Sequence, residues 1–415
     1  MRGLVALVVL SACGDGVPGP DATGTPDANV GLVRVRFPGH VETDVFFQNV
    51  DSSLVLATHT DRDGEANAYM APGGYVTVVS RDAFTTTIFT WAGVEGGDEL
   101  ELLRDAPGVD PATVFLSIPP DDPSTFFYQL VSSCGVSAIN GAEIDVLPVE
   151  LVNCPSTTVG MLVQTFGGVS RFLFREAVSI QQGAVISLEG PYLDLATLTV
   201  HAVNVPPQLP RLTARAALVG SGSELYVGDD LSEIAATGGT ATAAISMPLP
   251  STGVLAWQLR GTHASQLGAT SATAWGPVTH AVTLDFGAPL RHYTSTPHYV
   301  PAQHAIRWTE DPVGRVADGV IVSLPWQHVG TGEGLTWRVL APRSEDPVVR
   351  LPVLPLADLR PGEGDLVFDP TVLSSFAVDG GYASVRPYLL GQFDQVQTWP
   401  LRGASGQVVV ETLPP

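Results

Sequence analysis

Short runs of alternating hydrophobic and polar residues recur along most of this chain. Residues 32–37 (LVRVRF) alternate apolar and charged side chains, as a strand with one buried face does. Similar short runs follow, separated by turns rich in glycine, proline, asparagine and aspartate. Long stretches with helical periodicity are missing from the sequence. The pattern predicts an all-β protein.

Turn-rich breaks group the predicted strands into antiparallel β-sandwich domains in tandem. A chain of 415 residues is long enough for about three domains of ordinary size. We place the sandwiches at residues 30–105, 111–189, 190–287 and 288–415, with a linker at residues 106–111 between the first two. No repeat of fixed period occurs, which disfavours a propeller or a solenoid.

Some segments carry a weaker pattern. Residues 265–275, rich in alanine, serine and threonine, are predicted to form a loop. Residues 382–390 and 396–401 are predicted to be strands of the last sandwich.

Two motifs in the first sandwich carry a resemblance to a known family. Residues 60–66 (TDRDGEA) form a predicted turn, with Gly64 at a position suited to positive φ, and residues 72–79 (PGGYVTVV) begin the next strand pair. This order resembles the carboxypeptidase-regulatory-like, transthyretin-type β-sandwich. The resemblance implies a structural or interaction module without an active site. A calcium loop starting at Asp61 is disfavoured, since its twelfth position is Pro72 instead of a glutamate.

The last sandwich contains a strand centred on a tryptophan. Residues 335–342 (LTWRVLAP) precede a proline-bounded segment at residues 350–355 (RLPVLP). This arrangement resembles fibronectin-III and immunoglobulin-like domains, in which a tryptophan fills the core between the two sheets.

The first thirteen residues look like an export signal. Arg2 precedes a short apolar run at residues 4–10, which is too short to cross a bilayer as a helix. Residues 10–13 (LSAC) resemble the lipobox of bacterial lipoproteins. The resemblance implies a signal peptide at residues 1–12 and a diacylglycerol on Cys13, which anchors the protein in a membrane.

Residues 13–29 then form a lipidated cysteine followed by a flexible tether of glycine, proline, aspartate and threonine. Gly14 follows the cysteine in place of aspartate, which favours the outer membrane over the inner one. We therefore expect a lipid-anchored protein of the cell envelope, on its periplasmic or its surface face.

Removing Cys13 from the thiol count leaves two cysteines. Cys134 and Cys154 are predicted to form a disulfide in an oxidising compartment. The segment between them alternates and turns at Asn140 and Gly141, which predicts two adjacent strands. Two free thiols or a metal pair are the alternatives, but no further cysteine and no nearby histidine supports a zinc site.

The charge restricts the choice of partners. The net charge is −22 and the sequence contains no lysine, which disfavours nucleic acid because binding to phosphates depends on basic patches. The missing lysine also excludes a P-loop, a Ser-x-x-Lys nucleophile and a Schiff-base site. We expect no cofactor and no resident metal. The sequence leaves the oligomeric state open.

One segment carries candidate recognition chemistry. Aromatic and histidine side chains gather between residues 291 and 308, the composition of many recognition surfaces. The candidate binding residues are His292, His298, Tyr299, His304 and Trp308. Burial of the tryptophan in the core is the competing interpretation. The leading hypothesis is a non-enzymatic envelope protein that binds a protein or a glycan; the alternative is an extracytoplasmic hydrolase with a site in residues 280–330.

Overall fold

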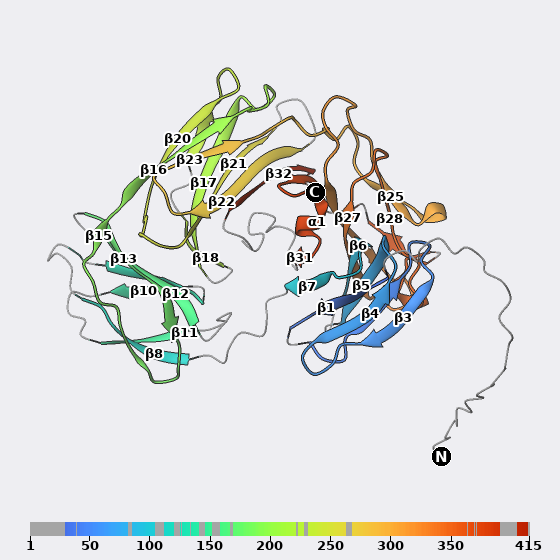
Figure 1. Cartoon of the computed structure of the whole chain (residues 1–415), viewed down its shortest axis with the longest axis horizontal. Helices are drawn as coiled ribbons and strands as arrows, with labels where there is room; N and C mark the ends of the chain where they lie inside the picture. Colours follow the sequence, from blue (N-terminus) through green and yellow to red (C-terminus); the bar gives the residue numbers. More distant parts are fainter. Residues whose placement is uncertain are drawn as a thin grey trace, which may run out of the picture.

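The computed structural model is built almost entirely of β-strands, and the prediction of an all-β protein is confirmed. Four groups of strands follow one another around an open arch (Figure 1). The structure describes residues 30–38, 40–81, 85–103, 112–119, 125, 127–132, 134–140, 146–151, 158–166, 169–220, 223–227, 231–262, 268–362, 364–368, 370, 372–390 and 405–413.

The first group of strands is a sandwich of two sheet segments. One is ordered β7-β1-β4 and the other β6-β5-β2-β3. Their bounds are β1 (Gly31–Arg36), β2 (Asp44–Gln48), β3 (Leu54–His59), β4 (Glu65–Met70), β5 (Gly74–Arg81), β6 (Thr85–Val94) and β7 (Glu99–Leu103).

The turn predicted at residues 60–66 connects β3 to β4. Asp61 Oδ1 accepts hydrogen bonds of 2.9 Å from the backbone N–H groups of Asp63 and Glu65. Gly64 has φ 74°, and a Cβ there would lie 2.3 Å from the carbonyl oxygen of Phe37, so only glycine fits. The Asp61 carboxylate thus stabilises the turn by accepting hydrogen bonds from its backbone.

The second group has sheets of order β10-β9-β12-β13-β15 and β11-β8-β14. The prediction that the two segments after Cys134 pair with each other is wrong: β10 pairs with β9, whereas β11 pairs with β8 in the other sheet. The chain crosses between layers here, which alternation along one segment cannot reveal. The bounds are β8 (Ala112–Ser117), β9 (Phe127–Ser132), β10 (Gly135–Asn140), β11 (Leu147–Leu151), β12 (Thr158–Phe166), β13 (Arg171–Ser179), β14 (Val185–Ser187) and β15 (Leu193–Asp194).

The third group contains a strand where a loop was predicted. Most of residues 265–275 belongs to β22, which pairs with β21 and β32 on its two sides. Its small alanine, serine and threonine side chains are mostly buried, so small size here reflects tight packing. The bounds are β16 (Ala196–Val203), β17 (Arg211–Gly220), β18 (Ser223–Val227), β19 (Leu231–Ala235), β20 (Ala241–Met247), β21 (Val254–Thr262), β22 (Ala269–Pro277) and β23 (Ala281–Asp285).

The fourth group corrects the strand predicted at residues 382–390. Only its end is a strand, because Tyr382 and its neighbours form a helical turn. The Tyr382 hydroxyl donates to the carbonyl oxygens of Ala92 (2.6 Å) and Leu340 (3.2 Å), which holds that turn against the sheet. The bounds are β24 (His298–Val300), η1 (Pro301–Gln303), β25 (Ala305–Arg307), β26 (Gly319–Gln327), β27 (Gly334–Pro342), β28 (Val348–Arg350), η2 (Ala357–Leu359), β29 (Leu366–Val367), β30 (Val372–Val378), α1 (Tyr382–Val385), β31 (Tyr388–Leu390) and β32 (Gly406–Leu413).

A 14-stranded sheet joins three of the four groups. Its main path runs β18-β17-β21-β22-β32-β30-β26-β27-β6-β5-β2-β3, with β19 and β29 paired at its side. The step from β22 to β32 links the third group to the fourth, and the parallel step from β27 to β6 links the fourth to the first. The domain boundaries stay predictions, while the sheet runs continuously across the positions given for the first, third and fourth sandwiches.

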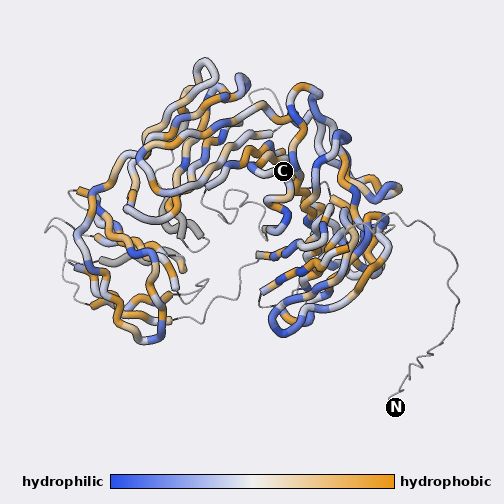
Figure 2. The backbone as a smooth tube through the Cα atoms, in the orientation of Figure 1, coloured by the Kyte–Doolittle hydropathy of each residue, from blue (hydrophilic) through white to orange (hydrophobic). Residues whose placement is uncertain are grey.

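The middle of this sheet is buried on both faces. Ile321 and Leu340 pack into the core of the first group, whereas their neighbours Val320 and Val339 pack into a second core with Phe46 and Ile88. Figure 2 shows the corresponding apolar stretches along the strands and hydrophilic colour at many turns. Two-sided burial explains why β26 reads as a nearly continuous apolar run in sequence.

Several predicted segments lie outside the described residues. These are the signal peptide and tether with Cys13, the linker at residues 106–111, Cys154, and the strand at residues 396–401. Among the residues that are described, no helix is both long and apolar enough to span a membrane.

Candidate functional site

The structure separates the five predicted binding residues into two environments. His292 and Trp308 lie in the interior, with 7% and 2% of their surfaces exposed. His298 is exposed, and Tyr299 and His304 are half-buried. Neither buried residue can therefore belong to an exposed surface in this structure, and a binding role for the other three stays a prediction.

Tyr299 and His304 belong to an aromatic cluster at the edge of the core that contains Phe46, Ile88 and Val320, which we call the fourth core. In the pairing of β24 with β25, Tyr299 lies opposite the buried Ile306, so it faces the core and His298 faces outward. The rings of Tyr299 and His304 meet edge to face at 6.0 Å, and His304 meets Trp337 at 5.9 Å. We call Tyr299, His304, Trp337 and the adjoining Trp326 the Tyr299 cluster.

The local chain fold sets the position of His304. A single 3-10 turn at Pro301–Gln303 ends at His304, whose φ of 48° is left-handed. Its backbone N–H donates to Pro301, and its carbonyl accepts from Leu351 at 2.9 Å. A left-handed conformation is uncommon for a residue with a side chain, and here both backbone groups are bonded within the fold. The imidazole is thus held between Tyr299 and Trp337.

An arginine acts on the two titratable side chains of this cluster. Burial lowers the pKa of the His304 imidazole, and the nearby Arg360 guanidinium lowers it further, so the ring is neutral at pH 7. Burial raises the pKa of Tyr299, and Arg360 acts on this group as well. Tyr75, half-buried against the same core, has Arg350 in the corresponding role. Two partly exposed tyrosines, each within the electrostatic reach of an arginine, form a surface composition enriched at binding interfaces.

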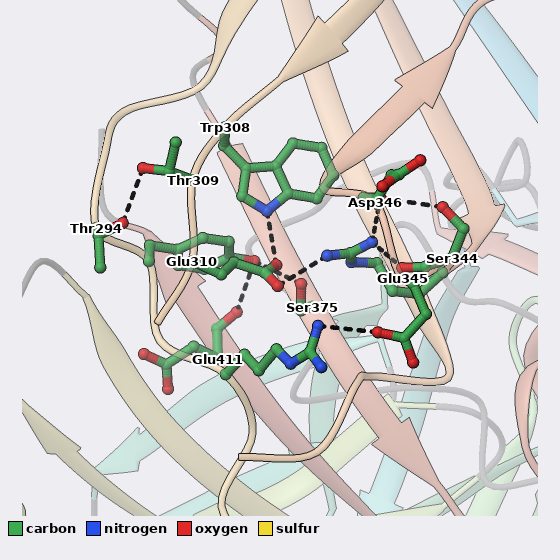
Figure 3. A network of polar contacts seen from close by, with 12 residues as sticks. Thr294, Trp308, Thr309, Glu310, Ser344, Glu345, Asp346, Ser375 and Glu411 are labelled. Carbon is green, nitrogen blue, oxygen red and sulfur yellow. Dashed lines mark hydrogen bonds and ion pairs between the residues drawn. The ribbon is translucent and has the colours of Figure 1, made fainter. Parts of the chain in front are cut away.

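Trp308 belongs to a different arrangement, a buried clamp with Glu310 and Arg343 (Figure 3). Trp308 Nε1 donates to Glu310 Oε1 and Arg343 Nη2 donates to Glu310 Oε2, both at 2.7 Å. The Arg343 guanidinium lies 5.1 Å from the Trp308 ring centroid. The side chains of Arg343 and Glu310 are 1% and 7% exposed, so this clamp fixes the loop after β27 to the chain after β25.

His292 belongs to a second buried network, which the sequence did not reveal. Glu411 on β32 is fully buried, and its Oε1 lies 3.1 Å from His292 Nδ1. Thr270 Oγ1 on β22 donates to Glu411 Oε2 at 2.5 Å. The Gln208 amide contacts the other ring nitrogen of His292.

Tyr293 continues this network. Its hydroxyl donates to Ser375 Oγ at 2.8 Å (Figure 3), and burial raises the pKa of the phenol. One signal in sequence could have indicated the network: Glu411 ends an uninterrupted apolar run, residues 408–410, inside a strand. A carboxylate at such a position needs polar partners in the core.

The two cysteines of the predicted disulfide can be placed only in part. Cys134 packs against the core of the second group, and its backbone N–H donates to Ser132 Oγ at 3.2 Å. Cys154 lies outside the described residues, so the disulfide stays a prediction. Within the described part of the chain, no group of three or more His, Cys, Asp or Glu side chains is placed to hold a metal ion.

Comparisons with known proteins give little beyond this. No family model and no curated protein matches the chain. Among solved structures, a Ca²⁺-stabilized adhesin with which an Antarctic bacterium binds ice is 10% identical, over 86% of this chain and 97% of that one, with a TM-score of 0.13. The Bacillus anthracis TIE protein is 11% identical (62% and 50% covered, TM-score 0.15), and a Streptococcal ancillary pilin is 12% identical (62% and 99% covered, TM-score 0.17). TM-scores this low support no argument about function.

Proposed function

We propose that this chain is a lipid-anchored envelope protein that binds a protein or a glycan through the surface around His298 and the Tyr299 cluster. The observation that carries the proposal is the position of half-buried Tyr299 and Tyr75 at the edge of one core, with Arg360 and Arg350 within electrostatic reach of them. Tyrosine and arginine supply a large contact area and directed hydrogen bonds, and both are enriched among the residues that dominate binding energy.

The scaffold suits this role physically. β24, β25 and β28 form a three-stranded sheet packed on the fourth core, and that core also contains residues of the 14-stranded sheet. Recognition groups held on such a support lose little conformational entropy on binding, since their backbone is already ordered. In this proposal the folded strand groups hold the binding surface in place. The lipid on Cys13 attaches the protein to the membrane, and the tether at residues 14–29 separates the folded part from it.

The binding surface is tested with immobilised glycans and purified envelope proteins. Tyr299→Ala and Arg360→Ala should each weaken the binding seen for the wild type by about tenfold, the loss expected for a central interface residue. Tyr69→Ala is the matched control, because Tyr69 is an exposed tyrosine (67%) on β4 of the first group. Equal binding by Tyr299→Ala and the wild type contradicts the proposal.

The anchor is tested separately by fractionating cells and by treating intact cells with protease. The wild type should be membrane-bound, while Cys13→Ser should be soluble or remain uncleaved. Soluble behaviour of both forms contradicts the lipid anchor without affecting the binding surface.

A further inference from the structure

The strand β3 ends the 14-stranded sheet, and its outer edge carries an unusual set of side chains. Within the described residues, β3 pairs only with β2. The pairing is regular from Phe47–Leu56 to Asp44–His59, and a bulge interrupts it only at the Leu54 end. The outer edge therefore offers a straight row of backbone N–H and C=O groups over the length of the regular pairing.

Both faces of β3 are open and apolar. Leu54, Val55 and Leu56 are 47%, 38% and 38% exposed, and Val55 is the extra residue of the bulge between Leu54 and Leu56. Gln48 Nε2 donates to the carbonyl oxygens of Ser52 and Val353, which brings the exposed Val353 next to the turn where β3 begins. Apolar surface thus continues from the strand to the adjoining loop.

Two other edges of this protein, those of β4 and β24, are blunted in ways that β3 is not. The edge strand β4 carries Glu65 and Asn67, and the edge strand β24 has only three residues. Natural sheets protect exposed edges by charge, by proline, by short length or by a β-bulge, and β3 has one such bulge, at Val55 near its start. β3 (LVLATH) has six residues with neither a proline nor an acidic or arginine side chain. Its composition favours strand addition.

The charge around β3 indicates what kind of strand fits. Exposed acidic residues lie at both ends: Asp51 in the turn before it, and Asp61 and Asp63 in the turn after it. Glu42, also exposed, precedes β2; the exposed cations nearby are Arg62 and Arg81, and Arg81 is paired with Asp44 of β2, so acidic side chains outnumber arginines here. A second copy of a chain with net charge −22 is repelled, whereas a basic segment is attracted.

We propose that β3 is a docking edge at which an extended, apolar segment with basic ends, from another protein, adds to the sheet as a further strand. Main-chain hydrogen bonds to the outer edge of β3 supply the affinity, and the acidic turns select the charge. This site lies on the first strand group and does not depend on the Tyr299 cluster.

The test uses a synthetic peptide of alternating valine and threonine with an arginine at each end. The full-length protein should bind it, and β3 amides should gain protection from hydrogen exchange. A peptide with alternate backbone nitrogens methylated should bind at least about tenfold more weakly, because it cannot complete the ladder. A peptide with glutamate at each end should also bind more weakly, and added salt should reduce that difference.

Protein variants separate strand pairing from charge. Val55→Lys places a charge on the open edge and should weaken binding about tenfold. Tyr69→Lys adds the same charge at an exposed position on β4 and should bind like the wild type. Asp51→Asn with Asp63→Asn should weaken the arginine peptide several-fold; the melting temperature of each variant reports whether it folds.

Several results overturn the proposal. They are equal binding of the methylated and unmethylated peptides, equal losses for Val55→Lys and Tyr69→Lys, protection away from β3, or no binding at all. Dimerisation of the wild type that Val55→Lys abolishes overturns it too, since a second copy is then the occupant. The methylated peptide is tested on the wild type, so a misfolded variant cannot obscure the result.

Discussion

Two histidine–carboxylate pairs in the fourth strand group differ in their surroundings. His292 and Glu411 lie under the sheet, where the carboxylate is completely buried and bonded to Thr270 on the neighbouring strand. His328 and Asp365 lie on loops, 2.7 Å apart, and retain 16% and 11% side-chain exposure. The same chemistry therefore fixes strands in one place and responds to pH in the other.

The two pairs differ because different groups take the place of water around the Glu411 and Asp365 carboxylates. Around Glu411, Thr270 on β22 and His292 on the loop after β23 contact the carboxylate, so losing one partner leaves a buried polar group without that contact and without solvent. Around Asp365, the backbone N–H groups of Gly362 and Val329 bond to the carboxylate and water remains close. These bonds lower the pKa of Asp365, and His328 lowers it further.

The largest effect is expected from Glu411→Ala. Removing one partner of a buried pair takes the carboxylate away from His292 and Thr270, which lowers the free energy of unfolding by about 3–5 kcal/mol. Calorimetry of the full chain measures this as a fall in the melting temperature of the transition that includes the fourth group. Glu411→Gln, which keeps an acceptor, should lose clearly less. A loss below about 1 kcal/mol for Glu411→Ala would place the network in contact with water.

A smaller loss, about 2 kcal/mol, is expected from Arg386→Ala. This arginine tests whether burial alone, without a histidine, makes a pair costly to break. Its guanidinium is 7% exposed, lies 2.7 Å from Asp98 and donates to the Gly93 carbonyl at 3.0 Å, 293 residues away in sequence. The variant should unfold earlier in urea and expose the first group to protease. Unchanged protease resistance would show that the sheet alone holds these parts together; Arg34→Ala, at an exposed pair, is the control.

The smallest effect is expected from Asp365→Asn, at most about 1 kcal/mol. Desolvation lowers the pKa of His328, but bonds to the Asp358 carbonyl and the Asp365 carboxylate outweigh it, so the net pKa is raised. The stabilisation by His328 is present in full below its unfolded pKa, about 6.5, and is lost as pH rises through the raised folded value. The lowered pKa of Asp365 sets the acid limit of this window.

Melting temperatures of the wild type and Asp365→Asn, measured from pH 5.5 to 9, check this last effect. Their difference should shrink towards alkaline pH. A difference that is constant over this range would mean that the pair contributes through hydrogen bonds only. Asp358→Asn is the control, because His328 bonds to the backbone carbonyl of that residue and not to its side chain.

Much of the fold followed from local pattern, because a strand with one buried face alternates along its own sequence. The strand at residues 31–36 is an example. β22 was missed because small residues pack tightly between two strands without the bulk that marks a strand. The strands that pair with β6 and β10 could not be predicted from sequence, because local pattern does not show which other strand a strand pairs with.

The candidate site was predictable only in composition. Sequence indicated a segment rich in histidine and aromatic residues, but not which of them are buried. His298 and His292 differ in exposure only because one lies outward on an edge strand and the other beneath β32. Glu411 and Thr270 come together only after β22 and β32 pair.

The parallel pairing of β6 with β27 also determines the order in which the molecule can form. Trp337 Nε1 donates to Thr90 Oγ1 at 2.9 Å, although 247 residues separate them. A chain made from its N-terminus completes the first seven strands long before β27 exists, and contacts this distant in sequence form slowly. Until then, one edge of β6 lacks its neighbour and exposes apolar side chains such as Ile88 and Trp91 to other chains. The final strands thus close the arch, and a chain that stops before residue 334 leaves its earliest-made part prone to aggregation.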